Sequence, residues 1–367
     1  MDERLTVVHL VPQDSWRGAQ VYAGRLRDEL ADDPEQRHFA VALFDAPVAG
    51  LRPDRVLTGR PTIRRRLGLD PLAVLRLRKL LADEGADVVV AHGGEPLKYA
   101  VAARTAAPVI YYKVGLSTAE LSRRSRLAFY RFLTRRVTLG VAVSSAVHDQ
   151  LRDVLGMPSA HLRIIPNARD PEVYYPAATP PGGIPRLIWI GQLEEGKQPG
   201  LFLDVIDSLQ SAGLKFSADM IGDGSMRREI EGRARHVGVE LLGVRDDVPS
   251  RLREASMLVT TSAPDTEGMP GVLIEAGLSG LPVVSTAAAG ANDVVAAGET
   301  GFVIESAEVS DLAQTITKLL RDPELRRTMG ARARGRCVAG FSIQAGAAQW
   351  RETVEGGALT NRRGGRG

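Results

Sequence analysis

The sequence predicts an α/β protein with two doubly wound parallel-sheet domains. Short apolar runs alternate with amphipathic helical segments, and this alternation stops once and then restarts. Short strands that are apolar throughout are typical of a parallel sheet covered by helices on both faces. The length of 367 residues also favours two domains, because an average domain has roughly 150 residues.

In the first half of the chain, apolar β-rich runs predict strands, and apolar residues at helical spacing predict the helices between them. Asp70 and Pro71 mark one helix start, because an aspartate caps a helix and a proline fits its first turn. The predicted strands are 5–11, 38–43, 87–91, 109–112, 139–143 and 162–165, and the predicted helices are 19–30, 71–84, 98–106, 118–136 and 145–155.

Residues 171–186 are rich in proline and glycine and predict a linker between a domain at 1–170 and a domain at 187–341. We expect a helix at about 342–355 to pack back on the first domain, and the Gly- and Arg-rich tail 356–367 to be disordered. In the second half, the predicted strands are 187–190, 216–221, 239–242, 257–260 and 283–285, and the predicted helices are 200–212, 225–236, 248–255, 271–278, 310–320, 323–334 and 342–354.

The composition argues against several classes of protein. The net charge of +3 is close to balance and gives no support to nucleic-acid binding. No apolar run approaches the roughly 20 residues of a membrane span, and no signal-peptide pattern is visible. The single cysteine, Cys337, excludes an intramolecular disulfide. We therefore expect a cytoplasmic protein, either a monomer or a dimer.

The strongest functional signal is Glu267-Gly-Met-Pro-Gly-Val-Leu-Ile-Glu275, which follows a predicted strand. Doubly wound sheets bind ligands outside the carboxyl ends of their strands, and two facing sheets would leave a cleft there. Gly268, Pro270 and Gly271 turn into a helix whose first amides can hold a phosphate, while carboxylates accept sugar hydroxyls. The pattern therefore suits a sugar nucleotide. The alternative is that Glu267 only caps the helix and Glu275 is solvated.

Three further residues lie just after predicted strands. Lys197 can neutralise a diphosphate, or it can pair with Glu194 or Glu195 as an ordinary surface lysine. His92 precedes two glycines at a strand end, where a hydrogen bond to a donor sugar is favoured over the structural role usual for a lone histidine. Gly18 opens a helix, so its backbone can approach a diphosphate or an acceptor.

The segment around Glu267 and Glu275 closely resembles the E-x7-E signature of the retaining, nucleotide-sugar-dependent glycosyltransferases of family 4, which have the two-domain GT-B fold. The resemblance extends over nearly the whole chain. The other matching segments are Gly18-Ala-Gln20, His92-Gly-Gly94, Ile165-Pro-Asn167, Gly191-Gln-Leu-Glu-Glu-Gly-Lys197, Gly222-Asp-Gly224 and Thr300-Gly-Phe302.

This resemblance implies an N-terminal acceptor domain, a C-terminal nucleotide-sugar domain and specific roles for site residues. Glu267 would contact hydroxyls of the donor sugar, Glu275 the ribose, and Lys197 the diphosphate. The departing phosphate would help to deprotonate an acceptor that attacks on the same face, so that the anomeric configuration is retained. The implied donor-binding set, besides Glu275, is Gly18, Asn167, Gly191, Gln192, Gly222, Gly268, Met269, Pro270 and Gly271.

The sequence departs from the family pattern at the phosphate-binding loop, where the uncharged Gln192 replaces an arginine. Either Lys197 suffices to neutralise the diphosphate, or one of Arg17, Arg169 and Arg245 supplies the second positive charge.

The expected activity is transfer of a sugar from a UDP, dTDP or GDP sugar to a small-molecule, glycan or lipid-linked acceptor, in bacterial glycan, glycolipid or natural-product glycosylation. The six histidines are scattered and no Asp-x-Asp pair occupies a predicted strand end, so we expect no metal and no other cofactor. The alternatives are a glycosidase using Glu267 and Glu275, a sugar-nucleotide 2-epimerase, and a non-catalytic sugar-nucleotide-binding subunit.

Residues 123–136 combine arginines with Leu127, Phe129, Phe132 and Leu133. The favoured interpretation is a surface helix whose apolar stripe faces inward. The other is an interfacial helix attracted to anionic lipid, which would bring the protein to the inner face of the membrane and indicate a membrane-linked acceptor.

Overall fold

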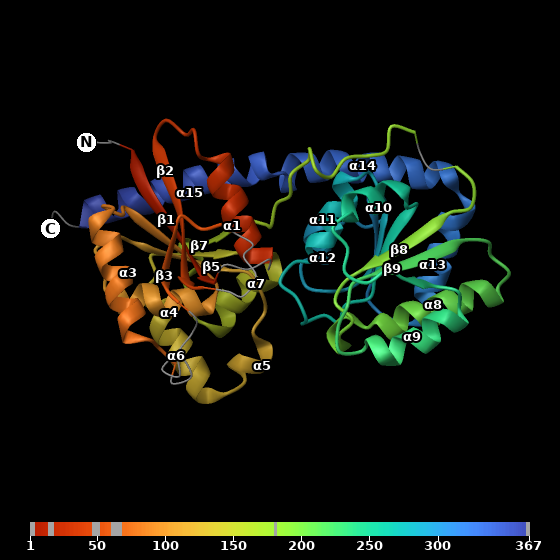
Figure 1. Cartoon of the computed structure of the whole chain (residues 1–367), viewed down its shortest axis with the longest axis horizontal. Helices are drawn as coiled ribbons and strands as arrows, with labels where there is room; N and C mark the ends of the chain where they lie inside the picture. Colours follow the sequence, from red (N-terminus) through yellow and green to blue (C-terminus); the bar gives the residue numbers. More distant parts are fainter. Residues whose placement is uncertain (1–3, 14–17, 46–51, 60–67, 180–181, 365–367) are drawn as a thin grey trace. The chain divides into compact units, whose positions relative to one another are not determined.

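Two parallel sheets organise the chain in a computed structural model that describes residues 4–13, 18–45, 52–59, 68–179 and 182–364. The chain divides into two units. Unit 1 comprises Met1–Asn167 and Ile343–Gly367, and unit 2 comprises Ala168–Ser342 (Figure 1).

Unit 1 contains a seven-stranded sheet in the order β3-β2-β1-β4-β5-β6-β7, with every described pairing parallel. Helices α1 and α15 pack side by side, as do α3 and α4. The strands are β1 (Leu5–Gln13), β2 (Gln36–Phe44), β3 (Arg55–Thr58), β4 (Val88–His92), β5 (Val109–Lys113), β6 (Leu139–Ala142) and β7 (Leu162–Ile164). The α-helices are α1 (Gly18–Glu29), α3 (Pro71–Asp83), α4 (Gly94–Ala103), α5 (Thr118–Leu121), α6 (Arg124–Thr134), α7 (Ser145–Asp149) and α15 (Ile343–Gly364).

The sequence patterns account for most of unit 1. All five residues of β4 and of β5 are buried, as a strand covered on both faces requires. The side chain of Asp70 accepts a hydrogen bond from the Leu72 amide at 2.9 Å, which confirms the predicted start of α3. The edge strand β3 is not predicted, because two of its four residues are exposed and its apolar signal is short.

Two predicted helices of unit 1 are interrupted. The expected helix at 118–136 is divided into α5 and α6, because Arg123 has the extended backbone angles φ −81° and ψ 118°. The expected helix at 145–155 begins as α7 and ends in a π-helical turn at Gln150–Val154. Apolar spacing does not reveal either change, because the apolar residues on each side of the interruption remain at helical spacing.

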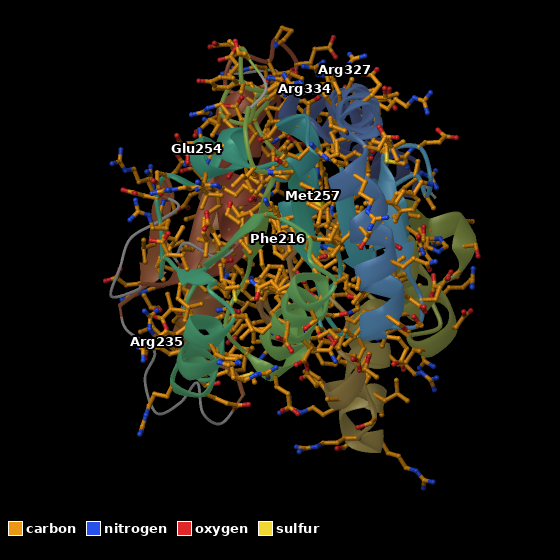
Figure 2. All side chains as sticks on the ribbon, turned by 90° about the vertical axis from the view of Figure 1, so that its right-hand side faces the viewer. Phe216, Arg235, Glu254, Met257, Arg327 and Arg334 are labelled. Atoms are coloured by element: carbon orange, nitrogen blue, oxygen red, sulfur yellow. The ribbon has the colours of Figure 1, made fainter. Side chains whose placement is uncertain are left out.

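Unit 2 contains a six-stranded parallel sheet in the order β10-β9-β8-β11-β12-β13. Figure 2 shows Met257 among the crowded interior side chains of this unit, whereas Arg235 and Arg327 extend at its periphery. The strands are β8 (Arg186–Ile190), β9 (Ser217–Ile221), β10 (Glu240–Leu241), β11 (Met257–Thr260), β12 (Val283–Thr286) and β13 (Gly301–Ile304). The α-helices are α8 (Pro199–Ser211), α9 (Arg227–His236), α10 (Val248–Glu254), α11 (Gly271–Leu278), α12 (Ala291–Val294), α13 (Val309–Arg321) and α14 (Pro323–Phe341).

The strand order reverses once in each sheet, between β1 and β4 in unit 1 and between β8 and β11 in unit 2. Ligands of doubly wound sheets bind at such reversal points, outside the carboxyl ends of the strands. The loops after β4, β8 and β11 are therefore the places where the fold favours a binding site.

The described parts of the predicted linker 171–186 belong to unit 2. Arg334 of α14 donates hydrogen bonds to the carbonyl groups of Tyr174 and Leu278, each at 2.6 Å, and so holds the start of this segment. The predicted disordered tail 356–367 differs from the structure, because α15 stays helical as far as Gly364. Its buried residues Trp350 and Val354 tie the helix to unit 1.

We predict that Trp350→Ala destabilises the protein by about 3–5 kcal/mol, because it removes a fully buried indole. The indole Nε1 also donates to the Tyr22 hydroxyl at 3.0 Å. Thermal unfolding checks this expectation, with Leu75→Ala on α3 as the control, since Leu75 is 63% exposed. A loss no larger than that of the control would contradict the role given to Trp350.

Candidate functional site

The loops that follow β8 and β9 pack backbone against backbone. The Gly191 amide donates to the Ile221 carbonyl and the Leu193 amide to the Asp223 carbonyl, both at 3.0 Å. Gly222 has φ 136°, and the Gly191 carbonyl oxygen occupies the place of a Cβ atom there. Only glycine fits this position. The predicted segment Gly222-Asp-Gly224 therefore allows close packing against the loop after β8, which is the candidate phosphate-binding loop.

The loop after β8 is also fastened to the loop after β11. The Gly196 carbonyl accepts hydrogen bonds from the Ala263 amide at 2.8 Å and from the Thr266 hydroxyl at 3.0 Å. The Thr261 hydroxyl lies 2.9 Å from the Lys197 carbonyl oxygen. These contacts bring the side chains of the two loops together.

Lys197 and Glu267 form an ion pair between these loops. Glu267 also accepts a hydrogen bond from the Ser262 hydroxyl at 3.0 Å. Both charged side chains are about four-fifths buried, with exposed fractions of 20% and 19%. Removing one member of such a partly buried ion pair costs the protein much more stability than removing one member of a surface pair, because the remaining charge is left buried without a partner.

This geometry overturns two of the alternative interpretations. Lys197 does not pair with Glu194 or Glu195 as a surface lysine, and Glu194 instead accepts hydrogen bonds from the amide and hydroxyl of Ser225 at 2.9 and 2.6 Å. Glu267 is not the helix cap either. Pro270 occupies that position, and no side chain of the described residues caps the start of α11.

A second ion pair joins Glu275, on α11, to Arg169 at 2.7 Å. Glu275 is not a solvated surface residue, since only 14% of its side chain is exposed. The Arg169 guanidinium lies against Gly271, where a Cβ atom would collide with it. A second positive charge therefore lies at the amino end of α11, where the helix dipole is also positive.

Of the three arginines considered as a second cation, the structure places Arg169 beside Glu275 and the amino end of α11. Arg245, another candidate, is held by Asp247 through two hydrogen bonds of 2.8 Å. The third candidate, Arg17, lies outside the described residues, and Gln192 itself is exposed. Of the two described arginines, only Arg169 lies against the start of α11.

The loop after β12 supports the turn that precedes α11, a role that sequence analysis misses. Gly290 has φ 75°, and a Cβ atom there would lie 2.6 Å from the Gly268 carbonyl oxygen. The Ala289 amide donates to the Pro264 carbonyl at 2.9 Å. Met269 within the turn is 4% exposed, so its side chain packs inward while its backbone shapes the turn. The sequence indicates this supporting role only by a glycine that follows an apolar strand.

The remaining predicted site residues belong to unit 1. His92 ends β4 and is 2% exposed, and its ring stands edge-on to Tyr112 with centroids 5.4 Å apart. The Tyr112 hydroxyl also lies 3.5 Å from Asn167 Oδ1, so His92 and Asn167 share one neighbour. Gly18 is the first residue of α1, as predicted. The stretch before it, 14–17, lies outside the described residues.

Within the described part of the chain, no group of three or more His, Cys, Asp or Glu side chains is arranged to hold a metal ion. Burial raises the pKa of the Cys337 thiol to about 12, which makes it a poor nucleophile at neutral pH. No described helix is long and apolar enough to cross a bilayer.

Comparison with known families agrees with this fold. Residues 16–173 match the sequence model of Glycosyltransferase Family 4, and residues 184–322 match that of Glycosyl transferases group 1. Together the two matches cover both units. The chain belongs to glycosyltransferase family 4 and has the GT-B fold of two Rossmann-like parallel-sheet domains.

Individual relatives are distant. The chain is 27% identical to the uncharacterized glycosyltransferase MJ1178 of Methanocaldococcus jannaschii over 55% of each protein. It is 26% identical to the UDP-Gal:alpha-D-GlcNAc-diphosphoundecaprenol alpha-1,3-galactosyltransferase of Escherichia coli, over 77% of this chain and 79% of that protein. The chain thus spans about half the length of the first relative.

The fold is similar to that of Anabaena Alr3699/HepE, which was crystallised with UDP and glucose. The TM-score is 0.79 with 21% identity, over 96% of this chain and 100% of that one. Sucrose-phosphate synthase from Thermosynechococcus elongatus gives the same TM-score with 18% identity, over 96% of this chain and 98% of that one. At these identities the likeness concerns the fold alone.

We predict that Gly222→Ala destabilises unit 2 markedly more than Gly213→Ala. Both glycines have positive φ, which costs an alanine about 1–2 kcal/mol, but only Gly222 has backbone atoms in the place of the Cβ. Thermal unfolding of the two variants separates the clash from the backbone strain. Equal losses of thermal stability in the two variants would show that the loops after β8 and β9 do not need this close contact.

Proposed function

We propose that the chain transfers a glycosyl group from a nucleoside-diphosphate sugar to an acceptor hydroxyl or amine with retention of configuration. The observation that carries this proposal is the pair of ion pairs beside α11, Lys197 with Glu267 and Arg169 with Glu275. Membership of glycosyltransferase family 4 supports it. Cations and helix amides suit a diphosphate, and carboxylates suit the hydroxyl groups of the two sugars that flank it.

The same residues suit the chemistry of the departing group. When the bond between the anomeric carbon and the phosphate oxygen breaks, negative charge grows on the nucleoside diphosphate. Lys197, Arg169 and the first amides of α11 can stabilise that charge. The acceptor oxygen or nitrogen forms the new bond on the same face of the sugar, and its proton passes to the departing phosphate oxygen.

We assign the donor to the UDP, dTDP or GDP sugars and take the UDP sugars as the first probes, since the fold neighbour from Anabaena was crystallised with UDP. Two cations of the chain supply positive charge for the diphosphate, which is the basis for expecting turnover without a metal. A glycosidase that used Glu267 and Glu275 would leave both cations without a role.

The test of this function is release of the nucleoside diphosphate from a panel of sugar nucleotides, with and without acceptor extracts and with and without a chelator. We expect release that depends on acceptor and persists with chelator. Conversion of the donor without acceptor would indicate a 2-epimerase. Binding of a sugar nucleotide without any turnover would indicate a non-catalytic subunit. Complete loss of nucleoside-diphosphate release in the presence of chelator would contradict the metal-independent mechanism.

We predict that Lys197→Ala and Glu267→Ala each lower turnover by about 10²-fold, because each removes a contact to charge or hydroxyl groups in the transition state. Glu275→Ala should chiefly weaken nucleotide binding, measured by calorimetry with UDP. Arg245→Ala is the matched control, since Arg245 pairs only with Asp247 among the described contacts. Near-normal turnover in either of the first two variants would remove that residue from the site.

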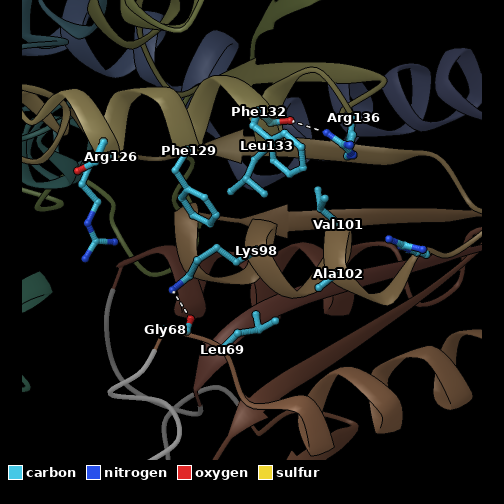
Figure 3. A pocket seen from close by; sticks show the side chains of 12 residues that line it. Gly68, Leu69, Lys98, Val101, Ala102, Arg126, Phe129, Phe132, Leu133 and Arg136 are labelled. Atoms are coloured by element: carbon cyan, nitrogen blue, oxygen red, sulfur yellow. Dashed lines mark hydrogen bonds between the residues drawn. The ribbon is translucent and has the colours of Figure 1, made fainter.

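A membrane-linked acceptor is supported by the surface of α6. The expectation that Phe129 and Phe132 form its inward stripe is wrong, because they are 39% and 48% exposed, while Tyr130 and Leu133 are the buried apolar residues. The aromatic rings instead face a cavity of about 650 Å³ between α4 and α6 (Figure 3).

This cavity combines apolar walls with positive charge. Lys98 and Arg104 contribute from the α4 side, and Arg126 and Arg136 from the α6 side. The Arg136 guanidinium lies 3.7 Å from the Phe132 ring centroid. Apolar side chains beside several cations are the features that attract a protein to an anionic lipid surface. We therefore propose peripheral contact with an anionic membrane at this cavity.

We predict that the protein sediments with vesicles containing phosphatidylglycerol and not with pure phosphatidylcholine vesicles. Phe129→Asp together with Phe132→Asp should abolish this sedimentation, because the substitutions remove apolar area and add negative charge. Leu75→Asp, at an exposed apolar position of the same unit, is the control. Sedimentation that is absent, or unchanged in the double variant, would refute membrane contact here.

A further inference from the structure

Four buried polar side chains form a continuous hydrogen-bonded row across the sheet of unit 1. Gln36 and His38 lie on β2, His9 on β1 and His92 on β4, and none is more than 8% exposed. His9 is in register with Ala40 and with Val90. Because side chains alternate along a strand, the three histidines face the same side of the sheet. The row ends at the carboxyl edge of β4.

The first residue of the row has a fixed orientation. The Gln36 Nε2 group donates to the Arg351 carbonyl oxygen at 3.1 Å and to the Glu355 carboxylate at 3.0 Å, both on α15. A backbone carbonyl can only accept, so this end of the amide must be the nitrogen. The Gln36 Oε1 atom therefore faces His38 Nε2, 3.0 Å away, and can only accept.

This orientation determines the tautomer of each histidine in turn. A neutral imidazole has one N–H group, and His38 uses it at Nε2 toward Gln36. His38 Nδ1 must then accept from His9 Nε2 at 2.9 Å. His9 Nδ1 in turn accepts from His92 Nε2 at 3.0 Å. His92 thus carries its proton at Nε2 and keeps a lone pair at Nδ1.

Burial keeps the three rings neutral, as this derivation requires. Desolvation lowers the pKa of His92 to about 3 and that of His38 to about 4. It also lowers the pKa of His9, and the neighbouring His38 and His92 lower it further. Asp33 raises the pKa of His38, but the loss of hydration on burial is the larger effect.

The row ends on an unsatisfied acceptor. His92 Nδ1 is buried and has no hydrogen-bond partner among the described residues. A buried acceptor without a partner is costly, so the position favours a group that can donate to it. His92 is followed by Gly93, with φ 98°, and lies at the strand-order reversal between β1 and β4. That edge is where a doubly wound domain receives its ligand.

We propose that Gln36, His38 and His9 are positioning residues that fix His92 as a hydrogen-bond acceptor, so that the ligand group recognised there must be a donor. A hydroxyl or an N–H group meets this requirement, whereas a carboxylate, a phosphate oxygen or a ketone does not. The ligand part rests on the proposed function and assigns the group to a hydroxyl of the transferred sugar. The tautomer part is independent of it.

Nitrogen-15 NMR of the full chain with labelled histidine tests the tautomers without any ligand. We expect His9, His38 and His92 to be neutral and protonated at Nε2 at neutral pH. Gln36→Met removes the oriented amide at similar volume, and it should produce a mixture in which part of the His92 signal shows a proton at Nδ1. A wild-type His92 protonated at Nδ1 or at both nitrogens would overturn the proposal.

Trp350→Phe is the matched control for this experiment. The centroid of the indole lies 6.3 Å from the ring centroids of His9 and His92, and its N–H group donates to the Tyr22 hydroxyl rather than to the row. The substitution should weaken packing yet leave the tautomers unchanged. If it disturbed them as much as Gln36→Met does, packing rather than the oriented amide would set the tautomer.

UDP-glucose added to the same labelled protein tests the ligand part. We expect the His92 Nδ1 resonance to move as the lone pair accepts a hydrogen bond. A His92 signal that stays still while other signals shift would overturn the ligand assignment and leave the tautomer intact. If no signal shifts, the proposed UDP-sugar donor fails, and the ligand assignment fails with it.

Discussion

Charge balance at the amino end of α11 is the constraint on which the candidate site depends. Two carboxylates and two cations meet there from separate segments, and each charge has an opposite partner, Lys197 with Glu267 and Arg169 with Glu275. Unpaired charges at this depth would be costly. A diphosphate with a sugar on each side can exchange partners with both pairs, since its phosphates suit the cations and its hydroxyls suit the carboxylates.

Backbone packing makes this arrangement of charges possible. The loops after β8, β9, β11 and β12 touch through their main chains at Gly222, Gly196 and Gly290, where a larger residue would collide with a neighbour. Backbone hydrogen bonds such as Gly191 to Ile221 and Ala263 to Gly196 hold these loops together. The glycines therefore serve the site indirectly, because they hold Lys197 and Glu267 within reach of one another.

Local patterns in the sequence are sufficient for most strands of the two sheets, though not for the edge strands β3 and β13, and for most helices and the spacing of Glu267 and Glu275. They do not identify long-range partners. Arg169 and Glu275 are 106 positions apart, and His9 and His92 are 83 positions apart. Their contacts depend on strand order and on how each loop folds. The exposure of Phe129 and Phe132 is a further case, since apolar spacing does not show which residues of α6 the rest of unit 1 covers.

A crystal structure with a bound UDP sugar tests the central claim most directly. We expect both phosphorus atoms beside the amino end of α11, with Lys197 and Arg169 turned from their carboxylates toward phosphate oxygens and Glu267 within hydrogen-bond distance of the hexose. A nucleotide bound elsewhere, with both ion pairs intact, would contradict the account.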